Sequence, residues 1–386
     1  MKAKEITCDV LVAGAGISGV AAAISASRQQ AKTILIEKNG FPGGIAVDCQ
    51  HRYICGLYPK NTGIAQDIIL GLQKLNPKNR FIRMGKLSVF SFAPKNLELI
   101  LRKLIQREKN LKVLYNCTVT QVKKEKGSIV SVKAAQKPLN RILNFMPRTV
   151  IDASGQGIVI KLGKAQYKLA PLKCRQLAGF TFEVRGLIDA SDLLAIKVPY
   201  YLSIWVKQKK LPAYFKFTNF ADGQTKNSGM IKLNLPAKNT SQPAQEAKKY
   251  ASLIHAYLRK VIPEFRNSRI HRVSSDIHER EGLRLYGEHI LTKEEVLSAR
   301  KFPDSIAKGC WPIEFWHPEK GQQIKYLGPN RFYQIPLGCL KSKNITNLFA
   351  TGKCISATPQ ALASSRVMGT CIYLGEAAGR AAGPTT

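Results

Sequence analysis

The feature that most constrains this chain is a glycine-rich turn close to its N-terminus. The segment Val10-Leu-Val-Ala-Gly14-Ala-Gly16-Ile-Ser-Gly19 has the spacing Gly-x-Gly-x-x-Gly directly after an apolar run. An Ala-rich stretch at 17–29 and a second apolar run at 33–37 follow it. This order predicts strand, helix and strand, the unit in which glycines let the backbone approach a pyrophosphate at a helix N-terminus. The segment therefore predicts a dinucleotide site.

An acidic residue stands where such a site needs one for the ribose. Glu37 ends the second predicted strand, 18 residues after Gly19. A carboxylate at this place accepts hydrogen bonds from ribose hydroxyls and disfavours the 2′-phosphate of NADP. With strand, helix and acid all in place, a ligand site is favoured over an ordinary glycine turn.

The chain is long enough for a second domain. It has 386 residues, 45% of them hydrophobic, so two domains with a shared interface can form. Apolar patterns predict a helix at 95–109 and strands at 111–115, 117–123, 128–134 and 149–153. From about 165 we predict short strands at 178–184, 200–206, 213–219 and 229–235 and an amphipathic helix at 243–261. A strand at 347–351 and a helix at 364–382 end the chain.

These patterns predict an α/β chain in three segments. Residues 1–164 and 331–386 together form a Rossmann-like domain, with a doubly wound parallel sheet and a β-meander. Residues 165–330 form an inserted, mostly antiparallel α+β domain, which we expect to carry the substrate side.

Three further segments decide which dinucleotide is bound. Glu37-Lys-Asn-Gly-Phe-Pro-Gly-Gly44 resembles the extension after the ribose acid in flavoproteins of the glutathione-reductase type. Asn347-Leu-Phe-Ala-Thr-Gly352 resembles their late FAD motif, and Thr149-Val-Ile-Asp-Ala-Ser-Gly155 resembles their mid-chain strand and turn. The resemblance implies FAD, because an NAD dehydrogenase needs no motif so far downstream. It implies that the cofactor is bound by Gly14, Gly16, Ile17, Ser18, Gly19, Glu37, Lys38, Gly43, Gly44, Val119, Ala153, Ser154, Gly155, Gly352, Ser365, Arg366 and Val367.

Three long segments, 280–296, 304–321 and 333–379, carry a more specific likeness. They resemble the bacterial family of FAD-dependent oxidoreductases distantly related to fumarate reductase flavoproteins. The chain departs from that family in Arg280-Glu-Gly-Leu-Arg284, where the family has Arg-Glu-Ser-Arg-Arg. It departs again in Glu314-Phe-Trp-His317, which is one residue longer than the family's Asp-Ile-His. The resemblance therefore implies the FAD site, while the substrate site has diverged.

Four residues are candidates for catalysis. His317 is the leading acid or base, because its ordinary pKa lies close to neutrality; the alternative is an ordinary interface histidine. If their segment is helical, Arg280 and Arg284 share a face and clamp an anionic substrate; otherwise they pair with nearby glutamates. Arg366 is expected in the first turn of a helix that begins near Ala363. There it would bind a substrate carboxylate or the flavin carbonyls, or be structural.

The cysteines favour reduced thiols and no metal site. Nine are present, with no Cys-x-x-Cys pair and no histidine at ligand spacing, so we expect no metal. Cys49, His51 and Cys55 follow the Gly43-Gly44 pair, in a region that passes the flavin in this fold. They are candidates for a covalent flavin link, for a redox disulfide, or for no role. The Cys-x5-Cys spacing and the single Gly-x-Gly-x-x-Gly disfavour the disulfide.

The formal net charge of +35 is the compositional oddity. Every block of a hundred residues is positive, which indicates a chain-wide lysine bias rather than a basic arm. Such a field still attracts nucleic acid, anionic lipid or anionic substrates.

Together these features predict an oxidoreductase that passes a hydride between a small organic substrate and flavin N5. Whether this substrate is anionic stays open. The electron partner stays open between a quinone, a protein carrier and NADH. The alternatives are a flavin-dependent tRNA-modifying protein, which is not favoured, and a non-catalytic flavin-binding redox subunit. No apolar run reaches 18 residues and the first nine residues do not resemble a secretion signal, so we expect a cytoplasmic protein. Peripheral contact with a membrane stays open.

Overall fold

The computed structural model describes residues 5–58, 61–189, 191–223, 225–237 and 242–383. Residues 1–4, part of the segment on which the cytoplasmic expectation rests, lie outside this range. Within it, none of the helices combines the length and the apolar character needed to cross a bilayer.

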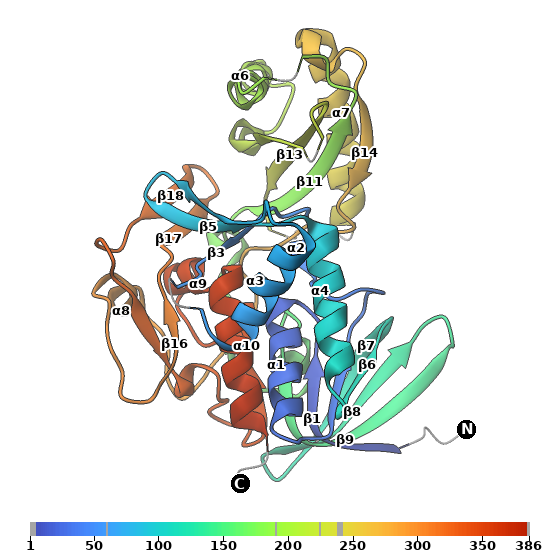
Figure 1. Ribbon diagram of the computed structural model, residues 1–386, viewed down its shortest axis with the longest axis vertical. Helices are drawn as coiled ribbons and strands as arrows, with labels where there is room; N and C mark the ends of the chain where they lie inside the picture. Colours follow the sequence, from blue (N-terminus) through green and yellow to red (C-terminus); the bar gives the residue numbers. More distant parts are fainter. Residues whose placement is uncertain (1–4, 59–60, 190, 224, 238–241, 384–386) are drawn as a thin grey trace.

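A seven-stranded sheet forms the body of the molecule (Figure 1). Its strands run in the order β6 (Leu111–Leu114), β2 (Thr33–Ile36), β1 (Glu5–Ala13), β9 (Arg141–Asp152), β8 (Ser128–Gln136) and β7 (Cys117–Glu125), and β20 (Leu348–Ala350) also pairs with β9. The pairs β1–β2, β1–β9, β2–β6 and β20–β9 are parallel, whereas β8 is antiparallel to both of its neighbours. The predicted combination of a parallel sheet with a β-meander is confirmed.

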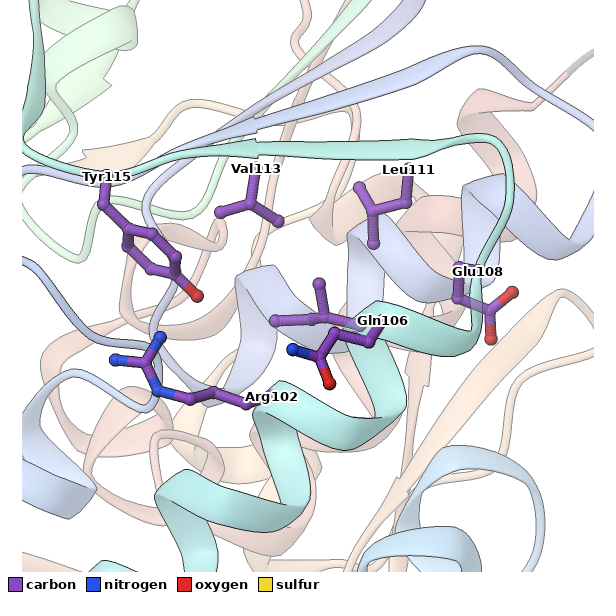
Figure 2. A pocket seen from close by; sticks show the side chains of 7 residues that line it. Arg102, Gln106, Glu108, Leu111, Val113 and Tyr115 are labelled. Atoms are coloured by element: carbon purple, nitrogen blue, oxygen red, sulfur yellow. The ribbon is translucent and has the colours of Figure 1, made fainter.

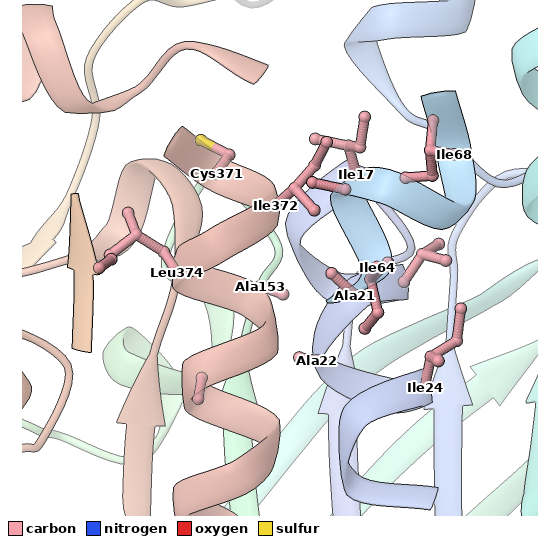
Figure 3. Close-up of a cluster of buried hydrophobic side chains, with 14 of the residues drawn as sticks. Ile17, Ala21, Ala22, Ile24, Ile64, Ile68, Ala153, Cys371, Ile372 and Leu374 are labelled. Atoms are coloured by element: carbon pink, nitrogen blue, oxygen red, sulfur yellow. The ribbon is translucent and has the colours of Figure 1, made fainter. Parts of the chain in front are cut away.

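Helices from the two ends of the chain pack together on this sheet. Figure 3 shows α1 (Ile17–Arg28) beside α10 (Met368–Ala382), with buried apolar side chains between them. A Cβ atom on Gly375 would lie 2.1 Å from the Ser18 carbonyl oxygen, and one on Gly379 would lie 2.1 Å from that of Ala22. Because only glycine allows this approach, the C-terminal helix fits closely against the first helix. The helices α3 (Gly63–Leu75) and α4 (Pro94–Arg107) lie next to this pair.

A second lobe, residues 178–273, stands on the body and is here called the insert (Figure 1). Its antiparallel sheet has the order β12 (Asn219–Asp222), β13 (Ser228–Leu235), β11 (Ala178–Arg185) and β14 (Arg269–Val273). The helices α6 (Leu194–Lys207) and α7 (Pro243–Val261) cover one face of it around a separate apolar core. In β13, Ile231, Leu233 and Leu235 belong to that core, so strand alternation turns Lys232 and Asn234 to the opposite face.

Shorter strands pair outside the two main sheets. One group is antiparallel: β3 (Tyr53–Cys55), β5 (Leu87–Ser91) and β4 (Phe81–Met84) form a three-stranded sheet. The remaining pairs are β10 (Tyr167–Lys168) with β15 (Arg284–Leu285), β16 (Ser305–Gly309) with β19 (Tyr333–Pro336), and β17 (Ile313–His317) with β18 (Gly321–Lys325). The described chain also contains the short α-helices α2 (Ile45–Asp48), α5 (Ile158–Leu162), α8 (Lys293–Leu297) and α9 (Pro359–Ser365), and short 3₁₀ helices.

Three sequence predictions of local structure are wrong. The strand predicted at 200–206 lies inside α6, because its run of aromatic and branched residues is apolar on every face and shows no helical period. The strand predicted at 213–219 is mainly a 3₁₀ helix, Ala213–Phe217. The single helix predicted at 364–382 is two helices, which break between Ser365 and Met368. By contrast, the helix predicted at 243–261 is confirmed as α7, while the domain limits at 164 and 330 stay a prediction.

Candidate active site

The glycine turn lies between β1 and α1, open on one side. Gly14 donates its backbone N–H to the Ile36 oxygen at 2.8 Å, and Gly43 donates to the Ala15 oxygen at 2.8 Å. A Cβ atom on Gly16 would meet no other atom within 4 Å, whereas one on Gly19 would lie 1.8 Å from the Gly14 oxygen. The turn is therefore tight against the protein at Gly19 and open at Gly16, at the N-terminus of α1. An open space at this place suits a phosphate group.

The second glycine pair and the mid-chain turn surround the same place. A Cβ atom on Gly44 would lie 3.1 Å from the Gly16 Cα, and one on Gly14 would lie 2.7 Å from the Ala153 oxygen. Ser154 donates its hydroxyl to Asp152 Oδ1 at 2.6 Å. Gly155 follows with φ +68°. The other predicted contacts at α1, Ile17 and Ser18, are buried in its first turn.

Glu37 is buried beside this turn and oriented by two backbone groups. Its Oε2 accepts the N–H of Ala15 at 2.6 Å, and its Oε1 accepts that of Asn39 at 2.9 Å. Its backbone oxygen accepts the Cys117 N–H at 2.8 Å, which places the start of β7, and Val119 two residues on, next to the acid. Because a carboxylate oxygen has two lone pairs, capacity remains for ribose hydroxyls. Lys38 is exposed at the edge of this group.

The late motif joins the first one from the other end of the chain. Thr351 donates its N–H to the Asp152 oxygen at 3.0 Å. Its hydroxyl lies 2.7 Å from that of Ser18, although 333 residues separate the two. Gly352 has φ +65°, and a Cβ atom on it would lie 3.2 Å from the Ser18 Cβ. The end of β20 is thereby held against the first turn of α1.

The helix break at residues 366–367 changes the expected position of Arg366. This residue ends α9, and Val367 precedes the first turn of α10, so Arg366 is not in the first turn of a helix. Around the break, the hydroxyls of Ser365 and Thr370 are buried without a hydrogen-bond partner among the described residues. Unpaired buried polar groups at the positive end of a 15-residue helix suit the carbonyl oxygens of a ligand ring. The residues present therefore fit FAD along both halves: open glycines for the pyrophosphate, Glu37 for the ribose, and unpaired donors for the ring.

A cationic cluster lies between the body and the insert. It consists of Lys232 from β13, Arg280 from the loop before β15, and Arg366. Arg280 donates to Asn234 Oδ1 at 2.7 Å and to the Leu177 oxygen. The Arg280 guanidinium carbon lies 4.2 Å from the ring centroid of Trp316, and the Lys232 ammonium nitrogen lies 5.4 Å from a ring centroid of the same indole. Arg280 is thus fixed by three partners.

Arg366 has capacity left for a ligand. Its Nη2 donates to the Glu314 backbone oxygen at 3.1 Å and lies 3.4 Å from Gln176 Oε1. Its Nε is buried and has no hydrogen-bond partner among the described residues. The nearby Glu314 carboxylate accepts from the indole N–H of Trp316 at 2.9 Å and from that of Trp311 at 3.1 Å. The Glu314 carboxylate thus accepts hydrogen bonds from two indoles and from Gln322 at 3.0 Å, and its interaction with the Arg366 side chain is electrostatic.

The cluster carries more positive than negative charge in a poorly solvated place. Burial, followed by repulsion from Arg280, lowers the pKa of Lys232 to about 8. Burial and the charge of Arg366 lower the pKa of Arg280 to about 9. Burial, the largest single effect, acts to raise the pKa of Glu314, but Arg366, the two indole N–H groups and Lys232 together outweigh it. The pKa is therefore lowered, and this carboxylate is ionised. Three cations facing one such carboxylate create a site that an anion would stabilise.

Cys49, His51 and Cys55 lie in the field of this cluster. Burial, with the charge of Lys232 next, lowers the pKa of His51 to about 3, so the imidazole is neutral. Burial raises the pKa of Cys49 and of Cys55 to about 12, so both are protonated. Both are also free thiols. Protonated thiols are poor nucleophiles, which disfavours a covalent flavin link or a redox role for either.

His317 and Arg284 have different surroundings from those expected. His317 ends β17, where its Nδ1 accepts the backbone N–H of Glu319 at 3.1 Å. Strand alternation turns it to the face opposite Glu314 and Trp316. Arg284 is in β15 and Arg280 in a loop, so the helical clamp predicted for this pair does not form. The Nε and Nη1 atoms of Arg284 are buried without a hydrogen-bond partner among the described residues.

Sequence reasoning missed Lys232, Gln176 and Trp316. The only signal for Lys232 was the alternation Ile231-Lys-Leu-Asn-Leu235, which ordinarily indicates one solvent-exposed face. In this molecule that face meets the body instead. Among the described residues, no group of three His, Cys, Asp or Glu side chains is arranged to hold a metal ion.

A separate surface pocket of about 250 Å³ lies between α4 and β6 (Figure 2). Arg102 and Tyr115 form one end of it, over apolar side chains of both elements. Arg102 donates to the Gly40 oxygen at 2.9 Å, so the pocket adjoins the Glu37–Gly40 turn.

Fold and site together define a flavin-binding protein of the Rossmann class. The chain belongs to the FAD dependent oxidoreductase family, whose model matches residues 9–385. It is therefore an enzyme with FAD as its cofactor. No curated protein matches it in sequence.

Solved structures of flavoenzymes are similar in fold only. Anhydrotetracycline hydroxylase OxyS from Streptomyces rimosus has 14% identity and a TM-score of 0.48, over 74% of this chain and 55% of that one. The flavin-dependent monooxygenase PieE, solved with FAD and substrate, has 11% identity and a TM-score of 0.48, over 91% and 53%. A geranylgeranyl bacteriochlorophyll reductase-like protein from Thermoplasma acidophilum has 12% identity and a TM-score of 0.46, over 98% and 78%. The chain spans about half the length of the first two.

Proposed function

We propose that this enzyme oxidises or reduces a small organic carboxylate, which binds at the cationic cluster of Lys232, Arg280 and Arg366. When bound, FAD supplies a hydride acceptor or donor at N5. The observation that carries the proposal is the buried, unpaired Nε of Arg366, next to two further cations. A buried guanidinium N–H without a hydrogen-bond partner is costly, and a carboxylate is the partner whose geometry matches it.

The three cations have different tasks in this proposal. Arg280 is held by Asn234, Leu177 and Trp316, so it contributes a fixed positive charge rather than a mobile ligand. Arg366 lies at the α9–α10 break, beside the unpaired hydroxyls that suit the flavin ring, and it binds the substrate carboxylate. Lys232, with a pKa of about 8, holds or releases a proton close to neutral pH.

Lys232 is thus a stronger acid–base candidate than His317, whose Nδ1 is occupied by its own turn. The charge of Arg284 interacts with that of Glu281, so in this proposal Arg284 has a supporting role and does not bind the substrate. The electron partner stays open between a quinone, a protein carrier and NADH.

An anaerobic substrate panel tests the proposal. We expect 2-hydroxy or 2-amino acids to reduce the oxidised flavin, or unsaturated acids to reoxidise flavin that has first been photoreduced, and the matching amides to fail. Replacing Arg366→Met should weaken the effect of the acid about 10- to 100-fold, because a charge-assisted hydrogen bond is lost. The control Arg380→Met removes the same charge from an exposed position of α10 and should change nothing. Equal activity of acids and amides would refute the carboxylate site, and an inert panel would refute the reaction.

A further inference from the structure

The helix α6 is apolar on two opposite faces. Leu194, Val198 and Leu202 are buried in the core of the insert. On the outer side, the exposed fractions are 56% for Leu193, 67% for Ile196 and 60% for Tyr200. At 100° per residue these three side chains lie opposite the buried three. A soluble helix ordinarily carries polar residues on that outer side, so this apolar face is a candidate contact surface.

The same segment is strongly basic. Residues 193–221 contain five lysines and no aspartate or glutamate. Lys207, Lys209 and Lys210 are exposed at the C-terminal end of α6, and Lys216 is exposed just after it. Among the described residues, Lys197 is the one lysine of this segment with an ion pair, to Glu264 at 2.5 Å. The outer face of α6 is thus an apolar strip that ends in uncompensated positive charge.

The position of α6 leaves this face accessible. Figure 1 shows the helix at the outer end of the insert, far from the seven-stranded sheet. The helix has 14 residues, about 21 Å at 1.5 Å per residue, and is too short to cross a hydrocarbon core of about 30 Å. An apolar face bordered by lysines is the arrangement with which helices lie in the plane of an anionic bilayer surface.

We propose that α6 docks this enzyme on anionic lipid bilayers. Ile196 and Tyr200 enter the interfacial region, and Lys207, Lys209 and Lys210 contact the acidic headgroups. A second copy of the chain fits this face less well, because a twofold contact would bring the lysine groups of two chains, each of net charge +35, together. The proposal does not depend on the identity of the substrate.

Vesicle sedimentation with the full-length, FAD-loaded protein tests it. We compare vesicles of phosphatidylcholine alone with vesicles containing one third phosphatidylglycerol. The protein should sediment with the anionic vesicles, and added salt should release it. The double variant I196Q/Y200Q and the triple variant K207Q/K209Q/K210Q should each bind at least about tenfold more weakly.

Two matched controls separate the α6 face from general properties of the surface. The variant L139Q/I142Q removes two exposed apolar residues of the body, with exposed fractions of 61% and 48%. The variant K103Q/K109Q/K112Q removes three exposed lysines near α4. Both should bind within about twofold of the wild type. Circular dichroism and flavin content confirm that every variant is folded.

Three results would overturn the proposal. Equal binding to neutral and anionic vesicles would show that the lysines do not bind acidic headgroups. An equal loss in the α4 lysine control would show that net charge, not α6, determines binding. Absence of vesicle binding, together with self-association that I196Q/Y200Q abolishes, would identify a second copy as the partner of this face.

Discussion

Gly16 and Gly19 lie three residues apart and have opposite surroundings. Space around Gly16 is open on the ligand side, while Gly19 touches the turn that it follows. Both are required by the same motif, but for different reasons: one lets a phosphate approach, and the other lets the helix pack on the strand. Replacement by alanine should therefore affect ligand binding at Gly16 and helix packing at Gly19.

Gly16→Ala should leave the fold intact and impair FAD binding. Its φ of −58° is ordinary for alanine, so we expect a change in the free energy of unfolding within about 0.5 kcal/mol. The added methyl group occupies the phosphate space, and the FAD affinity should fall at least about tenfold. Thermal unfolding and FAD titration of the apoprotein measure the two effects. Gly40→Ala, where the Cβ would lie 3.7 Å from Asn116 Oδ1, is the control. Wild-type FAD affinity in Gly16→Ala would contradict the position of the phosphates.

Lys232 should give carboxylate binding a distinct pH dependence. Its pKa of about 8 means that the ammonium is charged below this pH and neutral above it. Carboxylate affinity, followed through the flavin spectrum, should therefore fall as the pH rises through 8. Lys232→Met should bind more weakly and lose this step, whereas Lys226→Met, an exposed lysine of the insert, should behave as the wild type. An unchanged pH step in Lys232→Met would exclude this lysine.

The lowered pKa of Lys232 also makes the free energy of unfolding depend on pH. An unfolded lysine has a pKa near 10.4, so between about pH 8 and 10.4 the unfolded state binds more protons than the native state. Stability therefore rises with pH in this window, and Lys232 destabilises the native protein below it. Lys232→Met should unfold at a higher denaturant concentration at neutral pH. A lower unfolding midpoint would show that the ammonium is better stabilised than its burial indicates.

At the scale of elements, sequence patterns predicted helices and strands best where one face of the element is polar. The helix α7 was predicted with its bounds, since its buried residues recur with a helical period. The C-terminal half of α6, residues 200–206, was predicted as a strand because both faces of the helix are apolar, and the same property makes α6 a candidate for membrane docking. The break at Arg366 was missed because the residues on both sides of it favour one continuous helix.

The contact between α1 and α10 should be sensitive to a single methyl group. In Gly379→Ala the new Cβ would lie 2.1 Å from the Ala22 oxygen, which forces the helices apart. We expect about 2 kcal/mol of destabilisation from this overpacking, and weaker FAD binding, because α10 places the break at Arg366. Arg380→Ala, next in sequence and exposed, should change stability by less than about 0.5 kcal/mol. Chemical denaturation measures both, and equal stability of the two variants would contradict the close packing.

At the scale of the whole molecule, the proposed active site draws on both lobes. Lys232 and Asn234 come from the insert, Arg366 from the body and Glu314 from the hairpin between them. The FAD side was predictable because its motifs are continuous in sequence. The substrate side was not, because the cationic cluster is assembled from segments whose spacing in sequence carries no information about their contact.

The net charge predicts unspecific binding to polyanions. Since all parts of the chain are positive, RNA should bind weakly, and the affinity should fall steeply with added salt. Fluorescence anisotropy with labelled tRNA and an unrelated RNA should give equal affinities. A preference for tRNA that persists at physiological salt would instead favour the tRNA-modifying alternative.

The most direct test of the account is the absorbance spectrum of the purified protein before and after acid precipitation. The convergence of Gly16, Glu37 and Gly352 predicts one FAD per chain. The protonated thiols of Cys49 and Cys55 and the neutral His51 predict that acid releases all of it into the supernatant. A protein that neither contains flavin nor takes up added FAD would contradict the cofactor site, and flavin retained in the pellet would contradict its non-covalent binding.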